Sequence, residues 1–358
     1  MIDPVQLLVG AVSIPSISGA EREVAEYFKG ALSSAYDSCN IDDAGNLIAK
    51  VGYGPLRCYL LGHIDTVPGD ISVNLNGGIL TGRGAVDAKG PFCAAAAAVA
   101  NLPENILDKI TVTLIGAVEE EVSSSKGARY AVQSLPQPDL LVICEPSGWD
   151  AITMSYKGTL RARLTLEAPN EHTSAGTPSV GERLVDAWLQ IRDWANGTAS
   201  PGDRVFDRIH THLEDISVQG DGLLVQATCG IRFRLPIHWT PEKVEASLGK
   251  LDLNGVTFVD SGGERAYRAE RDSVLARAFR VAIRSQGSRP RMVVKTGTAD
   301  MNVVAHFWPV PMLAYGPGDS KMDHRPDEHI SIDDYLRSLE VLQDVFRYLA
   351  EMHKKEKP

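Results

Sequence analysis

The stretch Leu61-Gly-His-Ile-Asp-Thr-Val-Pro68 places a histidine and an aspartate directly after a short apolar run. Residues 58–61 predict a buried strand, so His63 and Asp65 are expected just beyond its carboxyl end. In open α/β sheets the carboxyl ends of the strands border the ligand crevice. The stretch therefore predicts an α/β sheet with a functional site at one of its edges.

Acidic residues and a second histidine recur at comparable places along the chain. The apolar runs 110–118 and 140–144 predict two further buried strands, and carboxylates follow both of them. A glycine-rich turn before an expected helix, and a glycine- and proline-containing segment near the C-terminus, add to the set. The candidate residues are Asp87, Glu119, Glu120, Glu121, Glu145 and His324. Each alone is more often a turn residue or a solvated helix start, so the inference rests on the ordered set.

Two imidazoles and several carboxylates form a donor set that suits zinc or another divalent metal. Carboxylates packed together without a cation would repel one another and resist ionisation. Two metal ions that share a carboxylate remove this repulsion, polarise a carbonyl group and activate water. The activated water needs a nearby general base, and a spare glutamate is suited to that task.

The pattern along the chain predicts two domains. Up to about residue 156, buried strands alternate with helices, which is typical of a sheet covered on both faces. From residue 157 the runs 160–166 and 223–235 alternate between apolar and polar residues, and helices are expected at 182–194 and 241–248. We therefore expect an α+β insertion at 157–262, with two strands, inside a catalytic domain of residues 1–156 and 263–358.

Composition narrows the class of protein. Of the 358 residues, 44% are apolar and 23% are charged, as in ordinary globular chains. The longest apolar run, 92–100, is too short to cross a bilayer, and the N-terminus lacks the features of a signal peptide, so we expect a cytoplasmic protein. A net charge of −10 argues against nucleic-acid binding. Five cysteines without a C-x-x-C pair argue against disulfides and thiolate metal sites.

The ordered set resembles the di-zinc amidohydrolase and exopeptidase family that includes aminoacylase, acetylornithine deacetylase, succinyl-diaminopimelate desuccinylase and glutamate carboxypeptidase. The resemblance covers nearly the whole chain, from residues 13–21 to residues 324–332. It implies a mixed-sheet α/β catalytic domain that holds two zinc or cobalt ions, with an inserted α+β lid and dimerisation domain.

Site roles follow from the resemblance position by position. The implied metal ligands are His63, Asp87, Glu121, Glu145 and His324. Asp87 would bridge two metal ions, and His63 and Glu145 would complete the first site, with Glu121 and His324 at the second. Asp65 would orient the ring of His63, as ligating histidines usually require. Glu120 would be the general base, although Glu119 stands where relatives often carry aspartate.

The resemblance also implies residues that contact substrate. His172 would reach the active site of a partner subunit and bind the developing oxyanion, which implies a homodimer formed through the lid. Alternatively, His172 only caps a helix edge. Arg234 would hold a substrate carboxylate, with Arg232 as the competing choice. Lys295 and Gly318 would also belong to the substrate and oxyanion region.

Three stretches, at 117–121, 125–129 and 295–302, resemble one branch of this family. Enzymes of that branch release lysine or ornithine from the C-terminal glutamate of a small acidic amino-group carrier protein, in lysine and arginine biosynthesis. A small-molecule N-acyl-amino-acid deacylase or a dipeptidase on the same scaffold is the alternative. A non-catalytic binding protein is disfavoured, because it would have no reason to keep the base Glu120.

The segment 265–295 carries nine basic residues and only two acidic ones, within a chain of net negative charge. Arg277, Arg280 and Arg284 are spaced so that they share one face of an expected helix. Such a face would steer an acidic partner toward the protein. The alternative is a solvated face whose counter-charges come from other parts of the fold.

Overall fold

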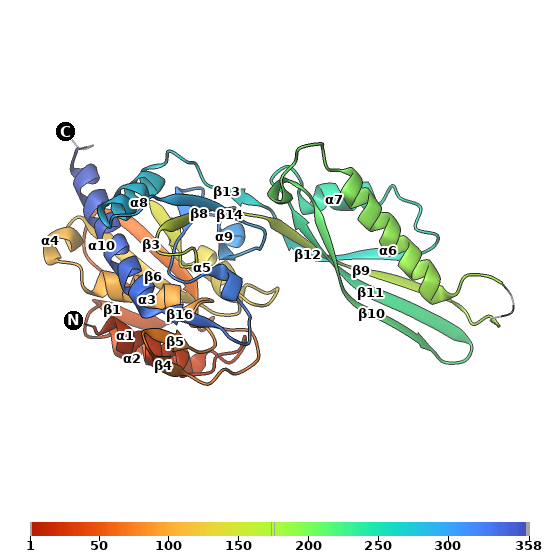
Figure 1. Ribbon diagram of the computed structural model, residues 1–358, viewed down its shortest axis with the longest axis horizontal. Helices are drawn as coiled ribbons and strands as arrows, with labels where there is room; N and C mark the ends of the chain where they lie inside the picture. Colours follow the sequence, from red (N-terminus) through yellow and green to blue (C-terminus); the bar gives the residue numbers. More distant parts are fainter. Residues whose placement is uncertain (1, 173, 175, 356–358) are drawn as a thin grey trace. The chain divides into compact units, whose positions relative to one another are not determined.

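The computed structural model describes residues 2–172, 174 and 176–355. The chain forms two compact units, shown in Figure 1. The first consists of Met1–Met154, Ala269–Val293 and Ala299–Pro358, and the second of Ser155–Arg268 and Val294–Thr298. None of the helices in the described ranges is both long and apolar enough to cross a membrane.

The first unit is built on a mixed sheet in the strand order β1-β2-β6-β3-β7-β15-β8. Its strands are β1 (Ser38–Ile41), β2 (Leu47–Val51), β3 (Leu56–His63), β6 (Ile110–Ala117), β7 (Leu140–Ile143), β8 (Ala151–Tyr156) and β15 (Met312–Ala314). The central strands β6, β3, β7 and β15 run parallel to one another, whereas β1 pairs antiparallel with β2, β2 with β6, and β8 with β15. The expected mixed-sheet α/β architecture is confirmed.

Helices bury both faces of this sheet. They are α1 (Pro4–Val12), α2 (Arg22–Leu32), α3 (Lys89–Ala100), α4 (Glu104–Leu107), α5 (Lys126–Ser134), α8 (Val274–Ser285), α9 (Asp300–Val304) and α10 (Ile332–Lys355). Helix α3 packs against β3 and β6 on one side and against α1 and α10 on the other. Its five consecutive alanines, residues 94–98, are buried, because small side chains let the helix approach all these neighbours closely.

A small three-stranded sheet joins residues 74–81 to the C-terminal part of the chain. It consists of β4 (Asn74–Asn76), β5 (Ile79–Thr81) and β16 (His329–Ser331), in the order β16-β5-β4. Strand β16 follows the segment that contains His324, and β5 precedes the glycine-rich turn that contains Asp87. The antiparallel pairing of β16 with β5 therefore holds these two distant segments together.

The second unit is a four-stranded antiparallel sheet, in the order β10-β11-β9-β12, covered on one face by helices (Figure 1). Its elements are β9 (Gly158–Pro169), α6 (Val180–Gly197), β10 (His210–Gly220), β11 (Leu224–Leu235), α7 (Pro241–Leu248), β12 (Thr257–Glu264) and β13 (Tyr267–Arg268). A 3-10 turn spans Val205–Asp207. Strand β14 (Arg291–Lys295) pairs with β8, and only its last two residues belong to this unit. Leucine, isoleucine and phenylalanine side chains of β9, β11 and α6 form its apolar core.

The prediction of only two strands in this insertion is wrong. The two missed strands, β10 and β12, are the edges of the sheet, and most of their residues are exposed. Without a buried face they lack the alternation of apolar and polar residues that identifies a half-buried strand. The central strands β9 and β11 have a buried face, and the prediction is within one residue for β11 and covers residues 160–166 of β9.

Candidate metal centre

Three of the candidate segments lie at the carboxyl ends of neighbouring parallel strands. His63 is the last residue of β3, Glu120 follows the end of β6, and Glu145 follows the end of β7. Strand β3 lies between β6 and β7 in the sheet. The parallel direction of the three strands therefore brings residues far apart in sequence to one edge, as expected from the apolar runs that precede them.

Asp87 lies between the two histidines of the set. The Nε2 atom of His63 is 3.2 Å from Asp87 Oδ1, and the Nε2 atom of His324 is 3.0 Å from Asp87 Oδ2. The two oxygens of one carboxylate thus face two different imidazoles. A carboxylate in this position can bridge two metal ions.

Glu145 and Glu121 extend the set on opposite sides of Asp87. Glu145 Oε1 is 3.7 Å from His63 Nε2, and Glu121 Oε1 is 3.0 Å from His324 Nε2. Ligand atoms at about 2.0–2.2 Å from a tetrahedral zinc ion are separated by about 3.3–3.6 Å. One donor atom each from His63, Asp87 and Glu121 lies within 4.8 Å of the others. The spacing and the chemistry of these donors fit divalent metal ions.

Several buried carboxylates share this site, and two of them are harder to ionise than usual. Burial, reinforced by the carboxylates of Asp300 and Glu145, raises the pKa of Glu120 well above its usual value. Burial, together with Asp65 and Glu145, raises the pKa of Asp300 to about 8. Both carboxylate oxygens of Asp300 are buried and accept no hydrogen bond from any described residue. Divalent cations would offset this charge, so the residues present fit the metal ions that the resemblance implies.

Asp65 contacts His63, as expected, and its side chain also holds a second segment of the site. The Nδ1 atom of His63 lies 3.0 Å from the backbone oxygen of Asp65 and 3.4 Å from its Oδ1. We assign the proton to Nδ1, which leaves Nε2 free to bind a metal ion. The Asp65 carboxylate accepts the backbone N–H groups of Glu120 and Glu121, each at 3.1 Å, and the hydroxyl of Ser18 at 2.7 Å. It therefore orients the segment of the expected base as well as the histidine.

Glu328 is a site residue that sequence analysis missed. Its carboxylate is fully buried, and Oε1 accepts the backbone N–H groups of Val86 at 2.8 Å and Asp87 at 3.1 Å. Its Oε2 pairs with Arg83 Nη1 at 2.8 Å. Glu328 thus fixes the turn that presents Asp87. The one sequence signal was its position four residues after His324, within the same charged motif.

The predicted substrate residues are divided between the two units. Gly318 lies in the first unit with a φ of +97°, and a Cβ atom there would meet Val86 Cγ1 at 2.8 Å. A glycine is thus required next to the turn that carries Asp87. His172, Arg234 and Lys295 lie in the second unit.

The environments of the second-unit residues differ. His172 is exposed, and its Nδ1 is 2.8 Å from Ser174 Oγ. Arg234 donates to Thr298 Oγ1 at 2.5 Å, whereas Arg232 is paired with Glu214. The Nζ atom of Lys295 lies 5.7 Å from the centre of the Tyr156 ring. Both arginines therefore have partners within the second unit.

Comparison with known proteins identifies the family. Residues 59–348 match the family described as Peptidase family M20/M25/M40. The chain belongs to this family. A [LysW]-lysine hydrolase of Deinococcus radiodurans is 45% identical over 350 residues, which cover 96% of each chain. A [LysW]-lysine/[LysW]-ornithine hydrolase of Sulfurisphaera tokodaii is 26% identical and covers 93% of this chain and 92% of its own.

Solved structures of two hydrolases share the fold. An M20 family metallo-carboxypeptidase of Sulfolobus solfataricus aligns with a TM-score of 0.78 at 18% identity, over 98% of this chain and all of its own. Human carnosine dipeptidase 1 aligns with a TM-score of 0.72 at 16% identity, over 97% of this chain and 96% of its own. The expected membership of an amidohydrolase and exopeptidase family is confirmed, and this M20 chain is a metal-dependent hydrolase of amide bonds.

Proposed function

We propose that this M20 hydrolase releases lysine, ornithine or both from the C-terminal glutamate of a small acidic amino-group carrier protein. The observation that carries this proposal is the 45% identity with the [LysW]-lysine hydrolase, over 96% of both chains. The reaction would be a cytoplasmic step of lysine or arginine biosynthesis. The geometry at the strand ends supplies the chemistry that such an amide hydrolysis needs.

Two divalent ions, zinc or cobalt, fit the donor set as two sites that share Asp87. His63 and Glu145 would hold the first ion, and Glu121 and His324 the second. When bound, such ions polarise the scissile carbonyl and make water a stronger nucleophile at neutral pH. Asp65 keeps the His63 ring in the orientation that presents Nε2, and Glu328 keeps Asp87 between the two histidines.

Glu120 is the general base in this mechanism. A carboxylate whose pKa is raised by burial is able to accept the proton of the attacking water and to release it again. As the amide C–N bond breaks, Glu120 passes that proton to the leaving nitrogen. The products are the free amino acid and the glutamate carboxylate of the carrier.

The second unit would act as lid and dimerisation domain. Its edge strand β10 carries the exposed apolar residues Ile216 and Val218, at 49% and 52% exposure. An exposed edge with apolar side chains favours pairing with another chain. In the homodimer that we propose, His172 binds the developing oxyanion in the site of the other subunit, and Arg234 and Lys295 contact the substrate.

The basic segment 265–295 is partly neutralised by ion pairs within each unit. Four of its nine cations have acidic partners, and the pairs are Arg265–Glu242, Arg268–Asp207, Arg280–Asp272 and Arg291–Asp150. Arg277 and Arg284 on α8 are exposed, and neither forms an ion pair with a described residue. We therefore narrow the proposed carrier-docking face to Arg277 and Arg284, one on each side of Arg280.

A direct assay tests the proposed function. The purified protein would be given carrier-linked lysine and carrier-linked ornithine, and in parallel acetyl-lysine and acetyl-ornithine. We expect a higher kcat/KM for a carrier-linked substrate than for either acetylated amino acid. Faster turnover of the small substrates would instead identify the enzyme as an N-acyl-amino-acid deacylase.

A further inference from the structure

Four consecutive backbone N–H groups just beyond β6 donate to side chains from three distant segments. The donors are Val118, Glu119, Glu120 and Glu121, and the acceptors are Asn46 Oδ1, Glu21 Oε1 and both oxygens of Asp65. The four distances lie between 3.0 and 3.1 Å. Side chains thus take the place of the strand partner that this segment no longer has.

The segment needs such support because its backbone is strained. Glu119 has a φ of +56°, in the left-handed region that side-chain-bearing residues rarely adopt. Such conformations persist only where surrounding contacts hold them. Glu119 stands directly before the general base Glu120 and the metal ligand Glu121, so its backbone angle determines where both side chains point.

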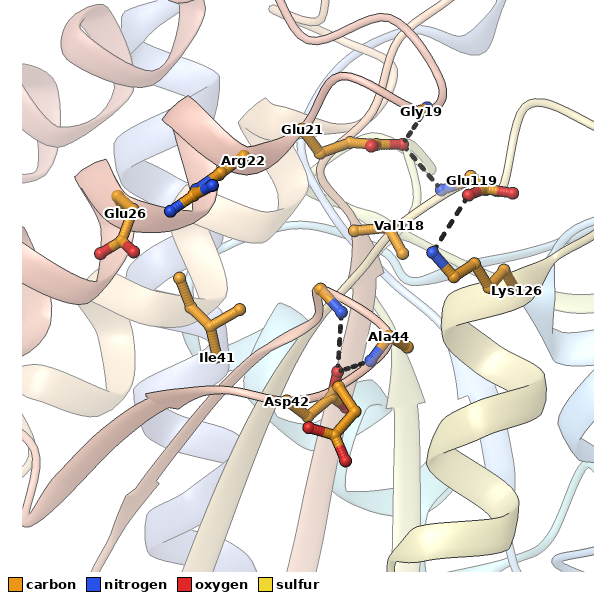
Figure 2. Close-up of a pocket in the computed structure, with 12 residues that line it drawn as sticks. Gly19, Glu21, Arg22, Glu26, Ile41, Asp42, Ala44, Val118, Glu119 and Lys126 are labelled. Carbon is orange, nitrogen blue, oxygen red and sulfur yellow. Dashed lines mark hydrogen bonds and ion pairs between the residues drawn. The ribbon is translucent and has the colours of Figure 1, made fainter.

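Glu21 holds the strained residue itself. The residue is only 5% exposed, and its Oε1 accepts the N–H of Glu119 at 3.0 Å and that of Gly19 at 2.8 Å. Figure 2 shows both hydrogen bonds at the pocket formed by the start of α2, the turn after β1 and the end of β6. Glu21 is also the residue before α2, yet its side chain makes no capping hydrogen bond to that helix in the described structure. A helix-capping role therefore does not explain its burial.

We propose that Glu21 is a positioning residue for catalysis, which acts through the backbone N–H of Glu119 to set the directions of Glu120 and Glu121. Because Glu120 and Glu121 have these roles only if the proposed function holds, the inference deepens that function. Glu21 lies in the N-terminal segment 13–21, whose Ser16 and Ser18 also anchor the site, by hydrogen bonds to Ile64 O and Asp65 Oδ2.

Four variants test this role. Glu21→Ala removes the acceptor, Glu21→Asp keeps the charge but shortens the reach by one methylene, and Glu21→Gln keeps an oxygen acceptor at the same reach. Glu26→Ala is the matched control. Glu26 lines the same pocket and also belongs to α2, but it is exposed and makes no hydrogen bond to the 118–121 segment within the described structure.

The measurements are kcat, KM, thermal midpoint and the affinity for zinc in competition with a chelator. We expect Glu21→Ala and Glu21→Asp to lower kcat and zinc affinity by about 10- to 100-fold, as outer contacts of metal sites typically do. KM should change little, and Glu21→Gln should retain most of both properties. A role confined to fold stability would lower the thermal midpoint but leave kcat and zinc affinity per folded molecule unchanged.

Two outcomes would overturn the inference. One is a folded Glu21→Asp variant with wild-type kcat and zinc affinity, and this variant serves even if Glu21→Ala does not fold. The other is an equal loss in Glu26→Ala, which would indicate a general effect of charge near the site. Zinc affinity requires no substrate, so the ranking of the variants remains interpretable even if the wild-type protein fails to release lysine from the carrier.

Discussion

The proposed metal ligands of the first unit and the proposed substrate residues of the second unit are held in contrasting ways. Around the cluster, buried carboxylates accept the backbone N–H groups of Asp87, Glu120 and Glu121. In the second unit, His172 is exposed, and its ring nitrogen contacts Ser174, two residues away. Groups fixed before the substrate arrives need no reorganisation during the reaction. The contrast indicates that the proposed metal ligands are preorganised, and we expect that the position of His172 is set only when it binds its partner.

Removal of the metal ions should have the largest effect. We expect a chelator to abolish turnover and added zinc or cobalt to restore it, since the preorganised ligands retain their places in the fold. Turnover would be followed together with the metal content of the same sample. Full activity in a metal-free sample would show that the first unit is organised for another chemistry.

Variants of Glu120 and Glu121 distinguish the proposed general base from the proposed metal ligand. Glu120→Gln should keep the metal ions and lose about 10²- to 10⁴-fold in kcat, because a positioned base contributes that much. Glu121→Gln should lose metal first. Steady-state kinetics and metal analysis of both variants would check this. If Glu120→Gln remains fast, Glu119 or Glu121 is the base.

The exposed position of His172 leads to a test of the homodimer. Neither Glu120→Gln nor His172→Ala should be active alone. After subunit exchange, about a quarter of the sites in a randomly mixed two-fold dimer would have an intact Glu120 and an intact His172. We therefore expect partial recovery of activity. No recovery in well-exchanged heterodimers would mean that each site is built within one chain.

The smallest effect is expected on the docking face. Reversal of Arg277 and Arg284 to glutamate should raise KM for the carrier substrate roughly three- to tenfold and leave kcat nearly unchanged, because such charges mainly change the association rate. KM and kcat for an acetylated amino acid should not change in the double variant. Arg291→Glu is a useful control, since that arginine is already paired with Asp150.

The salt dependence of turnover is a second test of the docking face formed by Arg277 and Arg284. With a Debye length of about 8 Å at physiological ionic strength, added salt should weaken carrier turnover more than turnover of the small substrate. If the carrier shows neither a salt dependence nor a KM increase in the double variant, docking takes place elsewhere.

The parts of the site that could be predicted are those that follow a local pattern of apolar and polar residues in the sequence. The apolar runs of β3, β6 and β7 are visible in the sequence, and the residues after them lie where the parallel strands end. The edge strands β10 and β12 were missed because they bury little, so their composition carries no periodic signal.

Partners across long sequence distances could not be predicted. Glu21, Asn46 and Glu328 hold backbone groups that lie 98, 72 and 242 residues away. The local sequence around a buried acidic residue does not indicate which N–H groups that residue will contact after folding. The same reason applies to the basic segment, whose counter-charges Asp150 and Asp207 lie more than 50 residues from their partners.

The contact between Glu328 and the Asp87 turn has a consequence for synthesis of the protein. Val86 emerges from the ribosome 242 residues before the carboxylate that will hold it. The early strands are free to collapse while translation continues, but the Asp87 turn can be locked only after almost the entire chain has been made. A nascent or prematurely terminated chain would therefore lack a formed metal site. Activity should appear only as a late step of folding, after the C-terminal segment has docked.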